Sequence, residues 1–568
     1  MAPHRQHWAH LSEDFDVLII GAGIMGSGIA RDAARRGLRV ALIDQHDIGY
    51  GTSSRSSKLV HGGLRYLEQW RFALVFESVK ERRILQRIAP HLVRPLAFLF
   101  PIYKGARIKL WMLRVGMWLY DIFSLFRAAA MHRMLSPAEA LIREPSLKRQ
   151  GLKGAPLYYD CSTDDARLTL ETALDAREAG ARVVTHCEAI SLRHDQDGRL
   201  TAVEVKDVET GESQNVFARL IVNATGPWTD SLLQCDGKNA SMLQLTKGVH
   251  IAVAHERLPL AHAITCINPI DQRVMFAIPW GSLTYLGTTD TPFTGQKDDV
   301  AASYEDVQYV LAAAHAYFPA LGLDARDVST TWAGIRPLIR PLSKEGMSPS
   351  SISREHEIRT SDDGLITVAG GKLTTYRQVA KEVVDLLIKR LYQQGQAPNK
   401  LRRCDTAYSP LPGARGLGRD PEVLLAVLQA SHGMLAEGTA RHLMATYGVR
   451  AQTIARMCGE RPDLLAPLID GLPEILAQVY FAVEQELARS VTDVLVRRTQ
   501  IFFRARDHGL AALDVVSCHM APLLGWSSTD TEKQRSDYFA YVKLHQRWKT
   551  GGEHEGASQD PDIDPATL

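Results

Sequence analysis

Cysteine, long apolar runs and blocks of like charge are all scarce in this sequence. Its seven cysteines are odd in number, widely scattered and never spaced as a CxxC pair. We therefore expect neither a disulfide framework nor a cysteine metal site, which suits a reducing cytosol. No stretch offers the roughly 18 uncharged apolar residues of a membrane span. The first ten residues are polar, so we also expect no secretory signal.

Charge is balanced along the chain. The 66 basic and 64 acidic residues leave a net charge of +2, with no basic block. Such a chain has no global attraction for nucleic acid, so we predict no nucleic-acid partner and expect any anion to be recognised locally. With 568 residues, 45% hydrophobic and 23% charged, the chain is expected to be globular with about two or three domains.

A glycine motif dominates the amino-terminal part. An apolar strand from Asp16 runs into Gly21-x-Gly23-x-x-Gly26 and then a helix. Gly21 permits the tight turn, Gly23 lets backbone approach a pyrophosphate, and Gly26 lets the helix pack on the strand. A second strand ends at Asp44, an acid placed to bind a ribose hydroxyl. The pattern predicts a dinucleotide site and leaves open whether the ligand is a flavin or a nicotinamide nucleotide.

Three later segments have the composition of ligand loops. Residues 51–67 combine five hydroxyl residues with two adjacent glycines and several basic side chains, which favours a ligand loop over an ordinary serine-rich turn. Residues 220–228 and 365–377 each run from an apolar strand into a turn of small residues. Glycine at such turns allows close approach of backbone to a cofactor, and free N–H groups at a helix start suit an electron-rich ring edge.

The segment 108–126 is the most apolar of the chain. Its apolar positions 111, 115, 118 and 122 recur at helical spacing, with basic residues at 107, 109, 114 and 127. This pattern suits a helix lying in a membrane interface. It equally suits a buried helix of a substrate domain, and the sequence leaves both interpretations open.

The remaining pattern predicts a mixed α/β structure followed by helices. Asp164 or Asp165 can cap a helix that ends at about residue 179, so both are interpreted as caps rather than catalysts. Residues 393–420 are predicted to be a linker, and 421–545 a helical domain. There Asp493 and Arg497 are four residues apart, which predicts a solvated salt bridge.

Taken together, the motifs resemble the FAD-dependent glycerol-3-phosphate dehydrogenases. The resemblance covers about residues 15–545 and rests on GAGIMGSGIARDAARRGL, TSSRSSKLVHGGLRYLE, VNATGPW, GTTD, AGIRPL, AGGKLTTYR and ELARSVTDVLVRRT. One departure is Asp44, where the family usually has glutamate. The resemblance implies an α/β fold: a glutathione-reductase-like, Rossmann-type FAD domain, a D-amino-acid-oxidase-like substrate domain and an all-α C-terminal domain.

The implied domain boundaries follow the motifs. Residues 15–90, 155–240 and 330–392 form the FAD domain, and residues 91–154 and 241–329 the substrate domain. Residues 1–14 and 546–568 lie outside the resemblance and are expected to be tails; the second is polar and contains proline, so it is expected to be disordered.

The resemblance implies FAD as cofactor and assigns residues to it. These are Gly21, Gly23, Gly26, Asp44, Thr52, Ser53, Ser57, Lys58, Leu59, Gly62, Ala224, Thr225, Gly226, Trp228, Gly370, Gly371, Lys372, Leu373 and Thr374. It further implies sn-glycerol 3-phosphate as substrate, dihydroxyacetone phosphate as product and a membrane quinone as acceptor. The chain would be cytoplasmic and peripherally attached to the inner face of the cell membrane, and a homodimer is left open.

Carried over by motif, the substrate-binding residues are Arg65, Tyr66, Arg336, Arg354 and Lys372. Arginine suits a phosphate dianion because its planar fork binds two oxygens and keeps its charge. The predicted catalytic residues are His61, Lys372 and Arg336. Either His61 or Lys372 would take the hydroxyl proton, helped by cations that favour alkoxide character. His61 could instead serve only to hold the flavin. No metal is predicted.

Other functions are compatible with parts of this sequence pattern. A glycerol-3-phosphate oxidase shares the site and uses oxygen as acceptor. An amine or amino-acid oxidase of the same superfold is disfavoured by the arginine set. A non-catalytic flavin-binding sensor is disfavoured because every cationic pocket residue is present. An NAD enzyme would have no use for the turns at 220–228 and 365–377.

Overall fold

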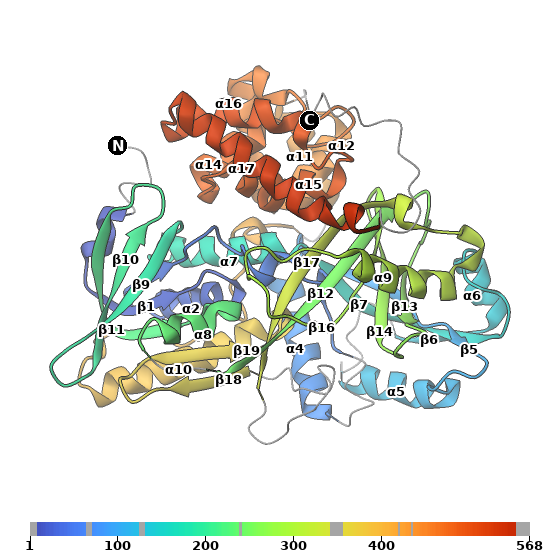
Figure 1. Ribbon diagram of the computed structural model, residues 1–568, viewed down its shortest axis with the longest axis horizontal. Coiled ribbons are helices and arrows are strands. Elements are labelled where there is room, and N and C mark those ends of the chain that lie inside the picture. Colours follow the sequence, from blue (N-terminus) through green and yellow to red (C-terminus); the bar gives the residue numbers. More distant parts are fainter. Residues whose placement is uncertain are drawn as a thin grey trace.

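The computed structural model describes residues 8–63, 71–123, 131–237, 241–340, 356–418, 421–432 and 435–552. Two β-sheets with their covering helices lie beside each other, and the C-terminal helices, orange to red in Figure 1, lie across one side of both. No helix in these ranges is both long and apolar enough to cross a membrane.

The first sheet is built around the strand that precedes the glycine motif. Its strands are, in order, β18 (His356–Thr360), β19 (Ile366–Gly370), β11 (Ser213–Asn223), β1 (Phe15–Ile20), β2 (Val40–Ile43) and β8 (Arg182–Val184), with β10 (Leu200–Asp207) on β11 and β9 (Cys187–His194) on β10. From β19 to β8 all neighbours are parallel. Every residue of β1 is buried, as expected of a parallel sheet covered on both faces.

Helices cover the first sheet and set its ligand edge. These are α2 (Ile24–Arg35), α7 (Asp165–Glu178), α8 (Thr229–Gln234) and α10 (Tyr376–Gln393). Because β1, β11 and β19 are parallel, the glycine motif and the turns after residues 223 and 370 meet at one edge. Ligands bind at the carboxyl edge of such sheets, and three segments far apart in sequence are therefore placed around one site.

The second sheet carries the substrate-domain segments. Its strands are β16 (Thr291–Pro292), β12 (Leu243–Ala254), β15 (Leu283–Gly287), β14 (Val274–Trp280), β13 (Ala263–Ile267), β4 (Val93–Leu99), β7 (Leu152–Thr163) and β3 (Leu59–Val60), with β17 (Val328–Ile339) on β12 and β5 (Ile102–Tyr103) and β6 (Arg133–Leu135) on β7. The helices beside it are α4 (Phe72–Ile88), α5 (Leu110–Phe123), α6 (Pro137–Arg143) and α9 (Tyr304–Tyr317).

Two of the expected domain boundaries coincide with strands of the second sheet. Both β7 and β17 belong to the second sheet, so the boundaries expected at 155 and 330 fall inside or beside its strands. The two strands end at Thr163 and Ile339, and no change in composition marks either end. The division into domains stays a prediction.

The C-terminal part is helical, as predicted. Its helices are α11 (Pro421–His432), α12 (Glu437–Tyr447), α13 (Ala451–Glu460), α14 (Ala477–Glu486), α15 (Ile501–Arg504), α16 (Leu513–Leu524) and α17 (Ser528–Gln546). The segment expected to be a linker is bound to the first domain, since Arg31 donates to the carbonyls of Thr406 and Ser409. The expected tails also contain buried residues, Leu11 and Trp548; residues 1–7 and 553–568 lie outside the described ranges.

The salt bridge predicted between Asp493 and Arg497 is present, but the prediction that it is exposed to solvent is wrong. Asp493 and Arg497 do form an ion pair, but both side chains are buried. They lie in a π-helical turn, Asp493–Arg498, that faces the first domain. There Asp47 accepts from Arg497 Nε (2.5 Å) and from both terminal nitrogens of Arg498 (2.7 and 2.8 Å). This ion cluster joins the helical domain to the strand end that carries Asp44.

Two buried histidines predict that the folded protein loses stability at acidic pH. Burial lowers the pKa of His442 to about 3, helped by the charges of Arg504 and Arg167, and burial also lowers the pKa of His545 to about 3. Both imidazoles are neutral in the folded chain and gain a proton on unfolding once the pH falls below about 6.5. As the pH falls from about 6.5 to 5, each of the two histidines should therefore lower the free energy of unfolding by about 2 kcal/mol.

Denaturant unfolding at about pH 7 and pH 5 measures this loss. The loss of unfolding free energy between the two pH values should be smaller in His442→Gln than in the parent. The reduction should be about half of the loss expected from the two histidines together. An unchanged pH dependence in that variant would contradict the assignment to His442.

Candidate active site

The glycine motif forms a tight cradle where β1 meets α2. Gly21 has φ +106°, and a Cβ on it would lie 2.6 Å from the carbonyl oxygen of Ala224. A Cβ on Gly26 would overlap the carbonyl oxygen of Gly21 itself. Both glycines therefore have the steric roles expected of a dinucleotide turn, and the cradle fits a pyrophosphate that must approach backbone closely.

Gly26→Ala tests this cradle. The added methyl can only be accommodated by moving the turn, at a strain of about 1–3 kcal/mol. FAD retention is expected to weaken by roughly tenfold to a hundredfold, measured by flavin absorbance after gel filtration and by reconstitution of the apoprotein. The matched control is Gly438→Ala in α12, where an added Cβ meets no atom within 4 Å; it should retain FAD like the parent.

Asp44 lies at the end of β2 with its carboxylate held by backbone. Its Oδ2 accepts from the N–H of Ala22 (2.7 Å) and its Oδ1 from the N–H of His46 (2.8 Å). Burial raises the pKa of Asp44, and these two hydrogen bonds oppose the rise. The carboxylate is thereby fixed in orientation at the wall of the first cavity, as the ribose-binding role requires.

The first cavity, of about 320 Å³, collects most of the predicted cofactor residues. Those in its wall are Gly21, Gly23, Asp44, Thr52, Ser53, Ala224, Thr225, Gly226, Trp228, Gly370, Gly371, Lys372 and Leu373. The sequence did not single out His46, Tyr50, Cys187, Glu188 and Ser231, which also line it. No motif marks these residues, because they join the wall only through the folding of separate strands and turns.

A second cavity, of about 200 Å³, continues the first. The two share Thr52, Ser56, Pro337 and the turn 370–373. Beyond the shared wall, the second cavity reaches Ser57, Leu59, His61, Arg336 and Thr374. An elongated ligand can thus extend from Asp44 past the glycine cradle to the turn at 370–374, which suits the length of a dinucleotide such as FAD.

Two cofactor loops are tied together at this end. The N–H of His61 donates to Thr374 Oγ1 (3.2 Å), and Thr374 Oγ1 is 3.4 Å from the carbonyl oxygen of His61. The SSKLVHGG and GGKLTT motifs are therefore neighbours in space. This places His61 and Lys372, the two candidates for proton transfer, in the wall of one cavity.

A third cavity, of about 570 Å³, opens from the same place. It shares Ser57, Leu59, His61 and Arg336 with the second cavity. Its polar part adds Arg273, Thr288 and Asp290, and its apolar part is lined by Phe98, Phe100, Phe276 and residues of α5. The arrangement offers a cationic end beside the cofactor loops and an apolar end beside α5.

Arg336 is held rigidly at the polar end. Its Nη1 donates to Asp290 Oδ1 (3.1 Å) and its Nη2 to Thr288 Oγ1 (3.0 Å). The guanidinium lies over Gly248 on the neighbouring strand β12, where a Cβ would overlap it. The GTTD and AGIRPL motifs are therefore neighbours in space: residues of the first orient the arginine of the second in the wall of the second and third cavities.

Arg273 is a cation that sequence analysis missed. It lies in the turn before β14, and its Nη1 donates to the carbonyl oxygen of Asp290 (2.6 Å). The turn Asp271-Gln-Arg273 carries no recognisable motif. Only the pairing of β14 with its neighbours brings this arginine to the cavity that Arg336 also lines.

His250 is a second residue that the sequence did not indicate. It is buried, stacks on Trp332 with ring centroids 4.8 Å apart, and its Nε2 is 2.8 Å from Ser57 Oγ. Burial lowers the pKa of His250, and the charges of Arg336 and Lys58 lower it further. A neutral imidazole therefore fixes Ser57 between the second and third cavities.

Three predicted cofactor residues lie behind the cavity walls. Gly26 packs under Gly21; the Lys58 ammonium donates to Asp165 Oδ1 (2.7 Å) in a buried ion pair; and the N–H of Gly62 donates to Asp160 Oδ1 (3.0 Å). These three residues therefore support the cofactor loops without lining a cavity. Asp164 is the cap of α7, as expected, whereas Asp165 serves chiefly as the partner of Lys58.

Three predicted substrate residues, Arg65, Tyr66 and Arg354, lie outside the described ranges. Their roles therefore stay predictions. Of the predicted substrate set, Arg336 and Lys372 are the members whose surroundings are described, and they line the second cavity together.

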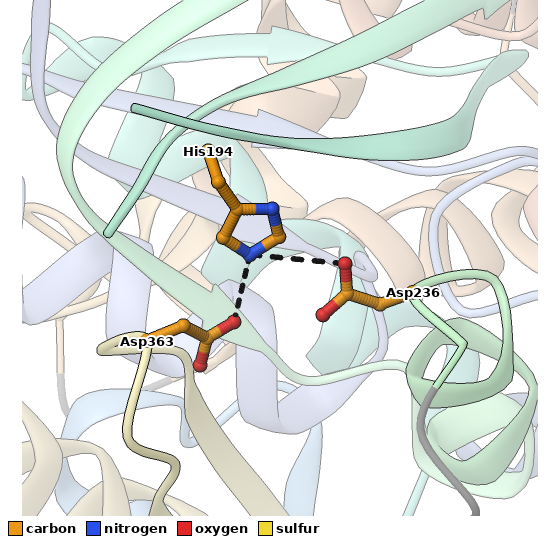
Figure 2. A group of neighbouring side chains, drawn as sticks. All are labelled: His194, Asp236 and Asp363. Carbon is orange, nitrogen blue, oxygen red and sulfur yellow. Dashed lines mark hydrogen bonds and ion pairs between the residues drawn. The ribbon is translucent and has the colours of Figure 1, made fainter. Parts of the chain in front are cut away.

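A polar cluster lies away from the cavities. His194 Nε2 is 3.0 Å from Asp363 Oδ2 and 3.7 Å from Asp236 Oδ1 (Figure 2). The imidazole comes from the end of β9 and the carboxylates from the segment after α8 and the turn before β19. An imidazole between two carboxylates ties these three segments together, and we assign the cluster this structural role.

Comparison with known proteins follows the same division of the chain. Residues 16–386 match a family model described as FAD dependent oxidoreductase, and residues 404–531 match the C-terminal domain of alpha-glycerophosphate oxidase. The aerobic glycerol-3-phosphate dehydrogenase of Staphylococcus saprophyticus is 37% identical over 525 residues, covering 92% of this chain and 93% of its own. That of Staphylococcus aureus is 37% identical over 539 residues, 94% and 95% of the two chains.

Solved structures agree. The glycerol-3-phosphate dehydrogenase of Bacillus halodurans, complexed with FAD, superposes with a TM-score of 0.79 at 33% identity, over 95% of this chain and 97% of that one. An L-alpha-glycerophosphate oxidase from Mycoplasma pneumoniae shares the fold, with a TM-score of 0.52 at 17% identity over 66% and 95% of the two chains. The predicted fold class and the predicted cofactor, FAD, are confirmed. The chain belongs to the aerobic glycerol-3-phosphate dehydrogenase family of FAD-dependent oxidoreductases.

Proposed function

We propose that this enzyme oxidises sn-glycerol 3-phosphate to dihydroxyacetone phosphate and passes the electrons to a membrane quinone. The proposal takes its substrate from relatives that carry this name over more than nine-tenths of both chains. The observation that carries it is the held guanidinium of Arg336, which faces a cavity shared with the FAD loops.

The phosphate end of the substrate is assigned to the cationic part of the third cavity. Arg336 and Arg273 both line that part. Asp290 holds Arg336 through its side chain and Arg273 through its carbonyl oxygen, so two guanidinium groups are oriented by one residue. A phosphate dianion suits such a pair, because arginine forks bind phosphate oxygens in fixed geometry. Arg65, Tyr66 and Arg354 are proposed to complete the grip.

The proton of the substrate hydroxyl is assigned to His61 or Lys372. Both line the second cavity, between the phosphate end and the turn at 370–374. Nearby cations favour alkoxide character on the hydroxyl. FAD, when bound, supplies the two-electron acceptor at its N5. The protein's own share is to hold the donor carbon toward that position and to exclude water from it.

An anaerobic titration tests the proposal directly. Glycerol 3-phosphate added to the purified holoenzyme should bleach the flavin absorbance, and a quinone analogue added afterwards should restore it. Failure of glycerol 3-phosphate to bleach the flavin would refute the substrate. Restoration by oxygen with peroxide formation, and no response to quinone, would select the oxidase instead. We further propose that the enzyme is cytoplasmic and attached peripherally to the inner face of the cell membrane, where it can reach a quinone.

A further inference from the structure

Helix α5 is buried on one side only. Leu113, Met117 and Tyr120 lie in the hydrophobic core, whereas the apolar side chains at positions 111, 115, 118 and 122 are exposed. The interpretation of residues 111–122 as a buried helix is therefore wrong for the outer side of α5. On the inner side, the Tyr120 hydroxyl bonds to residues of α4 and β7, so α5 also contributes to a buried polar cluster.

This cluster consists of Arg82 on α4, Tyr120 on α5 and Asp160 on β7, which are 4%, 2% and 4% exposed. Arg82 Nη1 donates to the Tyr120 hydroxyl (2.8 Å) and to Asp160 Oδ1, and the Tyr120 hydroxyl donates to Asp160 Oδ1 (2.6 Å). Burial raises the pKa of Tyr120 well above its ordinary value. The hydroxyl therefore keeps the proton that it donates to Asp160.

The Arg82–Tyr120–Asp160 cluster holds the backbone N–H of Gly62. That N–H donates to Asp160 Oδ1 (3.0 Å) and to the Tyr120 hydroxyl oxygen (3.1 Å). The approach is close, since a Cβ on Gly62 would lie 2.2 Å from the Tyr120 oxygen. This oxygen accepts from Gly62 and from Arg82 while its proton goes to Asp160, so all of its hydrogen-bonding capacity is used.

The two peptide groups that flank His61 are thus both held. On one side, the N–H of His61 donates to Thr374 Oγ1 (3.2 Å). On the other side, the N–H of Gly62 donates to the cluster. Because each peptide group is planar, holding both of them restricts the direction of the Cα–Cβ bond between them. The turn at 370–374 and the cluster together therefore set the direction in which the His61 imidazole leaves the backbone.

We propose that Arg82, Tyr120 and Asp160 are positioning residues for His61, which they orient through the backbone of Gly62 in the wall shared by the second and third cavities. The contribution of His61 to the reaction rests on the proposed function; the hold on Gly62 rests on the hydrogen bonds. Misplacing a group beside the reacting atoms by about 1 Å can lower a rate by about 10²-fold. Residues behind the site can therefore control the rate.

Tyr120→Phe tests the proposal, because Asp160 also lines the third cavity whereas Tyr120 is not among its lining residues. In the full-length holoenzyme, the anaerobic rate constant of flavin reduction at saturating glycerol 3-phosphate should fall about tenfold. The half-saturating concentration should change by less than about twofold, since the phosphate grip is untouched. The rates are normalised to the FAD content of each variant.

The matched control is Tyr317→Phe. The Tyr317 hydroxyl is likewise buried and accepts from a backbone N–H, that of Ile267 (3.0 Å), so both variants lose one buried hydrogen bond of the same kind. Tyr317→Phe should be reduced at the rate of the parent. Equal rate constants in Tyr120→Phe and Tyr317→Phe would overturn the proposal, as would a loss in Tyr120→Phe that disappears when its FAD is fully restored.

A double variant shows whether the cluster acts through His61. In the background of His61→Gln, adding Tyr120→Phe should change the rate constant of flavin reduction by less than about twofold, because the effects of residues that act through one group do not add. A further loss of about tenfold in that background would overturn the assignment to His61.

Amide hydrogen exchange provides a measurement that does not depend on the reaction. In Tyr120→Phe, residues 59–63 should exchange faster than in the parent and in Tyr317→Phe, because the N–H of Gly62 loses one of its acceptors. Unchanged exchange in this segment would overturn the hold on Gly62. If glycerol 3-phosphate fails to reduce the flavin of the parent while the exchange behaves as expected, the proposed function fails and the anchoring of the loop stands.

Discussion

Arg336→Ala is expected to lower kcat/KM for glycerol 3-phosphate by about 10²- to 10³-fold, while the slow oxidation of unphosphorylated glycerol changes much less. The guanidinium is the part of Arg336 that faces the cavity, and losing one partner of a partly buried charge pair costs about 3–4 kcal/mol. The loss has a second source. Asp290, which now accepts from Arg336 Nη1, would keep only the longer ion pair with Arg273 Nη1 (4.0 Å) among the contacts described here and would turn more negative charge toward the phosphate dianion.

Two further variants sharpen this result. Arg336→Lys restores the charge without the planar fork, so we expect a loss between those of the parent and the alanine variant. Arg326→Ala removes an arginine whose side chain is 92% exposed and pairs with Asp324 in its own turn, and it should leave kcat/KM unchanged. The decisive quantity is the ratio of kcat/KM for glycerol 3-phosphate to that for glycerol. An equal loss for both substrates would show that Arg336 does not bind the phosphate.

The parts of the site that are local in sequence could be predicted from it. The turn at Gly21–Gly26 is one example: strand, turn, helix and second strand follow one another directly, and the steric need for glycine is decided within the turn and its neighbour β11. The turn at 370–374 is another, since a strand, two glycines and a helix start are contiguous there. In both, the strand, the glycines and the start of the helix that form the turn are contiguous in sequence, although distant residues such as Ala224 also crowd the turn at Gly21.

The parts that depend on distant pairing could not be predicted in the same way. Arg273 reaches the cavity only because β14 pairs with β15 and the following turn supplies the carbonyl of Asp290. His250 becomes a neutral support for Ser57 because burial removes its proton. The ion pair of Asp493 and Arg497 has the spacing of a surface pair, and only the π-helical turn against Asp47 makes it internal. The spacing of two residues along a helix does not show which face of that helix other parts of the chain will bury.

The same buried cluster gives the largest expected effect on stability. Asp47→Ala removes a carboxylate that is fully buried and that accepts from Arg497 and Arg498, two arginines that are also buried. Breaking a buried ion cluster from one side leaves charge without compensation, which costs about 3–5 kcal/mol. Asp493 still pairs with Arg497, so the loss falls mainly on Arg498, which keeps the carbonyl oxygen of Glu486 and a longer ion pair with its carboxylate (4.0 Å). The measurement is the free energy of unfolding in urea, with the near-neutral pH held constant.

The control for that variant is Asp463→Ala, which removes one partner of an exposed pair with Arg461; no resolvable change in the unfolding free energy is expected, because exposed pairs contribute little. Asp47 lies three residues after Asp44, in the same turn that lines the first cavity through His46. Asp47→Ala should therefore also release FAD more readily than the control does. If the variant lost stability but kept its FAD affinity, the cluster would hold the helical domain without supporting the cofactor site; if neither changed, the buried pairing would be energetically neutral.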